Sequence, residues 1–99
     1  MVRRKLIWTL TALQNKKDIF KFWNKRNKST VYSNKLNLLF NEAMKFSTIF
    51  PEIGTQTEIN DIRIIFVRSY KLIYKITTDE IQVLTIWDMH RDPNELRIK

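Results

Sequence analysis

Hydrophobic and polar positions in the second half of the chain predict three β-strands. Ile62–Val67 is a run rich in apolar and β-branched residues, every second residue of Tyr70–Ile76 is large and apolar, and Ile81–Trp87 is a third apolar run. Arg68-Ser69 separates the first two runs, and residues 77–80 separate the last two. Runs of similar length joined by short polar breaks are typical of an antiparallel meander.

The first half of the chain shows the period of α-helices instead. In one segment the apolar residues are spaced 4-3-4-3-4 and would form a single stripe, made of Tyr32, Leu36, Leu39, Ala43, Phe46 and Phe50. We expect Ser29 or Thr30 to cap this helix. Pro51 should end it, because the residue before a proline is biased away from the α conformation.

An earlier helix and a first strand are predicted before this segment. The helix should span residues 12–27, capped by Thr11, whose hydroxyl can accept a backbone N–H of the first turn. Arg3–Leu10 is expected to be an edge strand. Glu52–Asp61 reads as a polar link, and it contains Gly54, the single glycine of the chain.

Together these elements predict one α+β domain over residues 1–99, with the element order β-α-α-β-β-β. The two helices are joined by only a few residues, so they should pair as an antiparallel hairpin. Their apolar stripes need a sheet to bury against. We therefore expect a helical hairpin packed on one face of a twisted antiparallel sheet, with the other face partly open.

Charge is distributed unevenly along the chain. The formal net charge is +8, and residues 1–50 carry 11 Lys and Arg against 2 Asp and Glu, whereas residues 51–99 carry 7 against 8. A basic surface of this kind favours polyanions such as RNA, the ribosome, DNA or an acidic protein. The lysine cluster over residues 16–28 has a simpler interpretation as well, as the solvated face of a helix.

The composition also bounds the location and the chemistry. The chain has no cysteine, so it has no disulfide framework and no cysteine nucleophile. No segment approaches the ~20 apolar residues of a membrane helix. We expect a cytoplasmic protein that does not bind a membrane. The acidic residues near the C-terminus are too scattered for a metal site, so we expect no metal and no cofactor.

The order of the strands and the residues around them resemble the RelE/ParE superfamily, the toxin halves of bacterial type II toxin–antitoxin pairs. The segments that carry the resemblance are Ile62-Arg63, Tyr70-Lys71-Leu72-Ile73-Tyr74, Phe50-Pro51-Glu52-Ile53-Gly54 and His90-Arg91-Asp92-Pro93. The resemblance covers nearly the whole chain. It implies a cognate antitoxin, which would wrap the toxin with an extended or helical, acidic segment that orders on contact.

For a RelE-type member, the resemblance implies metal-independent cleavage of messenger RNA on the ribosome, with the RNA 2′-hydroxyl as nucleophile. The positions that match basic catalytic residues are Arg63 and Lys71 on the sheet and His90 or Arg91 after it. We expect Arg63 and Lys71 to point to the open face, where cations can stabilise charge that builds up on a scissile phosphate. The nucleic-acid backbone would then be bound by Arg63, Arg68, Lys71, Lys75 and Arg91.

The chain departs from the RelE-type pattern at two places. Ile65 stands where a second sheet lysine would be, and no tyrosine follows His90. His90 itself could serve as the acid or base, because the ordinary pKa of histidine, about 6.5, suits that role. ParE-type toxins share the fold, lack the ribonuclease residues and inhibit DNA gyrase. A third interpretation is a non-toxic member that only binds an antitoxin or a nucleic acid.

Several of these residues also have ordinary structural interpretations. Arg63 could pair with acidic residues of the neighbouring turns, and Lys75 and Arg68 could simply be solvated. Tyr70 and Tyr74 share the parity of the apolar positions of their strand, so we expect both in the core.

Overall fold

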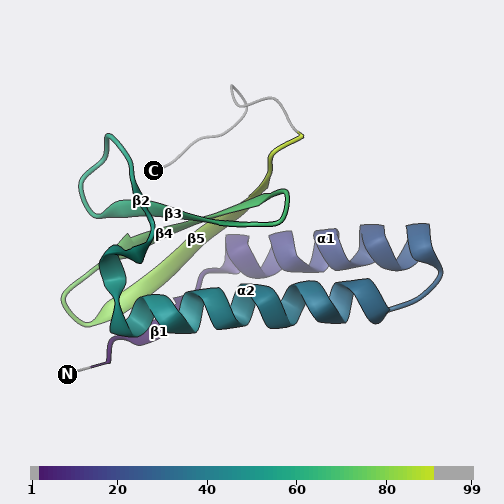
Figure 1. Cartoon of the computed structure of the whole chain (residues 1–99), viewed down its shortest axis with the longest axis horizontal. Helices are drawn as coiled ribbons and strands as arrows, with labels where there is room; N and C mark the ends of the chain where they lie inside the picture. Colours follow the sequence, from purple (N-terminus) through teal and green to yellow (C-terminus); the bar gives the residue numbers. More distant parts are fainter. Residues whose placement is uncertain (1–2, 91–99) are drawn as a thin grey trace.

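The computed structural model describes residues 3–90, which form two helices against one five-stranded sheet (Figure 1). The elements in chain order are β1 (Lys5–Trp8), α1 (Leu10–Asn27), α2 (Val31–Ile49), the 3-10 turn η1 (Pro51–Ile53), β2 (Thr55–Gln56), β3 (Ile62–Val67), β4 (Tyr70–Ile76) and β5 (Glu80–Asp88). The predicted β-α-α-β-β-β order is confirmed. The link before β3 was predicted without regular structure, but it contains η1 and the short strand β2.

The strands lie side by side in the order β1-β5-β4-β3-β2. β3, β4 and β5 form the predicted antiparallel meander, and β1 is an edge strand, as expected. However, β1 pairs with β5 in parallel, so the sheet is mixed and not wholly antiparallel. Tight turns fix the direction of strands within the meander, whereas the helical hairpin between β1 and the meander leaves the direction of β1 to tertiary packing.

Helix α1 begins earlier than predicted because Thr9, and not Thr11, is its N-cap. The Thr9 hydroxyl oxygen accepts the backbone N–H of Ala12 at 3.2 Å and lies 2.8 Å from the carbonyl oxygen of Val83, to which it donates. This single side chain therefore caps the helix and ties its first turn to β5. At the other end, Lys28 takes the left-handed conformation (φ 52°) that commonly closes a helix.

The core lies between the helical hairpin and one face of the sheet. Its fully buried side chains include Leu36, Phe40 and Met44 of α2, which pack against the helix-facing residues of β4 and β5. Tyr70 and Tyr74 are both in this core, at 3% and 0% exposure, so that prediction is confirmed.

The predicted stripe of α2 is only partly correct. Leu36 is buried, but Phe46 and Phe50 keep 49% and 47% of their surface exposed. After Leu36, the buried apolar residues of α2 are Phe40 and Met44, which are not part of the predicted stripe. α2 carries two adjacent apolar faces, so periodicity alone does not decide which one faces the core. The second face borders the groove described below.

The hairpin is longer than the sheet that it covers. α1 and α2 run antiparallel, and the turn that joins them projects beyond the strands at one end of the molecule (Figure 1). Among the described residues, no helix is both long and apolar enough to cross a membrane.

Candidate functional site

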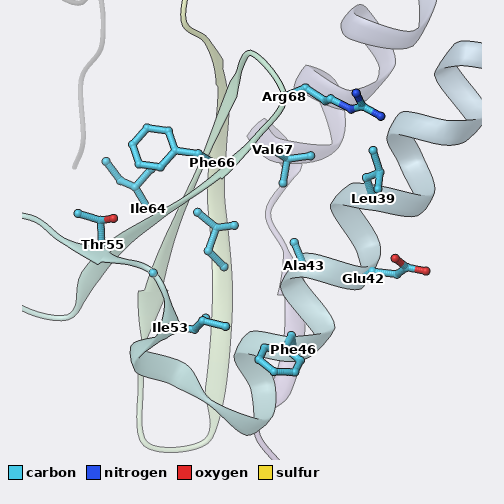
Figure 2. Close-up of a pocket in the computed structure, with 12 residues that line it drawn as sticks. Leu39, Glu42, Ala43, Phe46, Ile53, Thr55, Ile64, Phe66, Val67 and Arg68 are labelled. Atoms are coloured by element: carbon cyan, nitrogen blue, oxygen red, sulfur yellow. The ribbon is translucent and has the colours of Figure 1, made fainter.

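An open apolar groove runs between α2 and the outer part of the sheet (Figure 2). Its volume is about 770 Å³. We call it the α2–β3 groove, and its lining residues are Leu39, Glu42, Ala43 and Phe46 of α2, Ile53, Gly54 and Thr55 of the link, and residues 64–68 of β3 and the turn after it. Most of these side chains are apolar, with Glu42 and Arg68 as the charged exceptions.

The edge of β3 beside this groove is only partly paired. β2 contributes two residues, and its Thr55 pairs with Ile64. β3 continues to Val67, so in the part of the chain that the structure describes, residues 65–67 have no strand on their outer side. An unpaired strand edge next to an apolar groove suits the docking of an extended or helical segment.

Tyr74 of β4 anchors the η1–β2 link, which forms one wall of the groove, to the sheet. Its hydroxyl accepts the backbone N–H of Gly54 at 3.0 Å and donates to the carbonyl oxygen of Pro51 at 2.6 Å. Burial raises the pKa of Tyr74, which keeps this hydroxyl protonated and able to donate. The η1–β2 link therefore has a fixed position although it is short and largely irregular.

Arg63 supports the same link from β3. Its guanidinium donates to the carbonyl oxygens of Gly54 at 2.8 Å and Glu52 at 3.1 Å. Arg63 shares the parity of Ile65 and Val67, which pack against the core beneath the helices. It therefore lies on the helix-facing side of the sheet, and not on the open face where it was expected.

Lys71 lies on the opposite face of the sheet. Arg63 pairs with Tyr74 in the β3–β4 register, and Lys71 is three residues from Tyr74, an odd number, which places the two cations on different faces. The expected grouping of Arg63 and Lys71 on one face is therefore wrong. The two strands could be predicted from the sequence but their register could not, and register decides which side chains share a face.

The other predicted site residues that the structure describes are Lys75, Arg68 and His90. Lys75 shares the face of Lys71 but lies four residues along β4, about 13 Å away. Arg68 is exposed in the β3–β4 turn, at φ 55°. His90 is exposed, and its Nδ1 lies 3.0 Å from Oδ1 of Asp88. Arg91 lies outside the described residues.

Sequence reasoning missed the Tyr74–Gly54 contact and the groove. The single glycine in the link was the available signal for the first, since a chain that passes very close to a large side chain needs a residue without a Cβ. The second apolar face of α2 was the signal for the groove. It was assigned to the core instead.

Replacing Arg63 with Met should lower the free energy of unfolding by about 1–2 kcal/mol, because two carbonyl oxygens lose a charged donor at a partly exposed site. Urea denaturation measures this change. The matched control is Arg68→Met, an exposed turn position that should change stability by less than about 0.5 kcal/mol. Equal effects at the two positions would show that the Arg63 hydrogen bonds contribute nothing to the fold.

Comparison with known proteins agrees with this architecture. The chromosomal ParDE toxin–antitoxin system from P. aeruginosa has a similar fold, with a TM-score of 0.72 at 18% identity over 85% of this chain and 94% of that one. No curated protein matches the sequence. The family model described as the ParE toxin of the type II toxin–antitoxin system parDE matches residues 6–93. The chain therefore belongs to the ParE toxin family, which implies a cognate antitoxin as its partner.

Proposed function

We propose that this toxin arrests growth in the bacterial cytoplasm by inhibiting DNA gyrase, and not by cutting messenger RNA. The observation that carries the proposal is the separation of the two sheet cations. Arg63 is held by the carbonyl oxygens of Glu52 and Gly54, and Lys71 lies on the other face. A ribonuclease without a metal needs its cations around one phosphate, because the negative charge of the transition state develops there.

We further propose that the antitoxin docks in the α2–β3 groove. The groove offers apolar walls for the side chains of a bound segment, and residues 65–67 of β3 offer backbone groups for strand addition. Both features belong to the same surface. A segment that is disordered alone could pair with the strand edge and bury its apolar residues against Leu39, Ala43 and Phe46.

A pulse of expression in a susceptible bacterium tests the gyrase proposal. Incorporation of labelled thymidine and of labelled amino acids would be followed side by side, for the wild type and for Lys71→Gln/His90→Gln. Neither side chain is buried, so the double variant should fold normally. We expect thymidine incorporation to fall first in both strains.

Two results would contradict the proposal. If protein synthesis stops first and the double variant is harmless, the toxin acts as a ribosome-linked ribonuclease. If neither synthesis changes, the chain is a non-toxic member of its family that only binds partners.

A further inference from the structure

Exposed lysines form a row along one side of α1. Lys17, Lys21 and Lys25 follow one another at intervals of four residues, and Lys28 comes next at the C-cap. Residues at this spacing lie on one face of a helix, with a rise of about 6 Å between successive members. We call these four residues the α1 lysine row. It extends over about 17 Å of helix axis.

None of the four lysines has an ion-pair partner among residues 3–90. Within residues 3–90, the one ion pair joins His90 to Asp88. Asp18 is the only acidic residue of α1, and its carboxylate oxygen accepts the side-chain N–H of Gln14 at 2.9 Å. Like charges four residues apart destabilise a helix, whereas Lys25 and Lys28 are favoured by the negative end of the helix dipole, so the repulsion falls mainly on Lys17 and Lys21.

The neighbouring Lys16 does not belong to the row, because its amine contacts other side chains of the protein. Its Nζ lies 3.6 Å from the centre of the Trp8 ring and donates to the side chains of Asn37 and Asn41. Burial lowers the pKa of Lys16. Lys16 is thus a structural residue between the helices, whereas the row faces solvent.

The row is separate from the α2–β3 groove and accessible from outside. No residue of α1 lines the groove. The end of the row at Lys25 and Lys28 lies towards the turn that projects beyond the sheet (Figure 1). A large, rigid partner could therefore reach the row without displacing a segment bound in the groove.

The chemistry of the row fits phosphates better than an acidic protein. Protein partners anchor themselves on apolar side chains, and the two positions that flank Lys21 within the row, Asp18 and Asn24, are polar, whereas the exposed Phe22 borders the row at Lys25. A DNA strand rises about 3.4 Å per nucleotide, so lysines about 6 Å apart can each meet roughly every second phosphate. One exposed aromatic side chain, Phe22, lies at the edge of the row, three residues before Lys25, so successive unpaired bases would find no continuous stacking surface there.

We propose that the α1 lysine row binds the phosphate backbone of duplex DNA. This surface would act without sequence preference, since it offers point charges and no groups that read base edges. DNA binding by the row does not depend on which enzyme the toxin inhibits. If gyrase is the target, the row would hold the toxin on the DNA that gyrase is handling.

Binding of a short labelled DNA duplex to the full-length protein tests the proposal. Fluorescence anisotropy would be measured from about 50 to 200 mM salt for the wild type and for the variant with Gln at all four row positions. Four lost phosphate contacts should reduce the slope of log K against log salt by about 3 to 4 and weaken binding on the order of 100-fold at low salt. The matched control replaces four exposed cations elsewhere, Arg3, Lys5, Lys35 and Lys45, with Gln.

We expect the control variant, which loses the same charge, to keep most of the wild-type slope. Equal losses in both variants would show that only net charge matters, and the row would not be a site. Tighter binding of single-stranded RNA than of the duplex, through the same lysines, would overturn the assignment to duplex DNA. Loss of antitoxin binding in the row variant with DNA binding unchanged would make the row a protein interface.

Discussion

Replacing Gly54 with Ala is expected to lower the free energy of unfolding by about 2–3 kcal/mol. A Cβ at this position would lie 2.7 Å from the hydroxyl oxygen of Tyr74, 2.8 Å from its ring and 2.9 Å from the carbonyl oxygen of Ile64. The Tyr74 ring is fully buried and the carbonyl belongs to β3, so neither can move aside easily. Overpacking of this kind costs about 1–3 kcal/mol, and loss of the Gly54–Tyr74 hydrogen bond adds to it.

Urea denaturation of Gly54→Ala, of two single variants beside it and of one double variant makes this test specific. Thr55→Ala, an exposed neighbour in the same link, should change stability by less than about 0.5 kcal/mol. Tyr74→Phe removes one of the atoms that a Cβ would meet, so Gly54→Ala should cost less in that background than in the wild type. A Gly54→Ala variant as stable as the wild type would mean that the link does not depend on this contact.

Replacing Ala43 with Glu should weaken binding of the antitoxin by at least about 100-fold, or ~2.7 kcal/mol. Ala43 lies in the wall of the α2–β3 groove, and a carboxylate there would be buried without a partner under any docked segment (Figure 2). Such unpaired charges cost about 3–5 kcal/mol. The variant should stay folded, because Ala43 is only partly buried in the unbound protein.

Co-expression with the antitoxin of the same module provides the measurement. We expect the antitoxin to restore growth of cells that make the wild-type toxin and to fail with Ala43→Glu. Asn34→Glu is the matched control, since it places the same charge on an exposed position of α2 outside the groove, and it should be neutralised normally. Rescue of Ala43→Glu by the antitoxin would place the docking surface elsewhere.

The sequence was most informative where local chemistry decides the structure. The runs Ile62–Val67 and Tyr70–Ile76 became strands with the bounds that their β-branched residues and polar breaks predicted. Pro51 ended α2 near the predicted residue for an equally local reason. The ordered set of elements was enough to indicate the superfamily.

The sequence was least informative where packing decides. Both Arg63 and Lys71 were correctly placed on neighbouring strands, but the register that puts them on opposite faces is set by the sheet as a whole. The two apolar faces of α2 could not be ranked, so Phe46 was assigned to the core and not to the groove. The direction of β1 depends on how the hairpin packs. The functional roles of Lys71, His90 and Arg91 remain predictions.

The central claim is that this ParE-family toxin acts on gyrase, and supercoiling of relaxed plasmid by purified gyrase tests it most directly. Increasing amounts of the purified full-length protein would be added, with and without its antitoxin. We predict that the toxin blocks supercoiling, that Lys71→Gln/His90→Gln blocks it equally, and that the antitoxin restores it. The proposed function would be contradicted if a large excess of toxin left supercoiling undiminished while the same preparation cut messenger RNA on ribosomes.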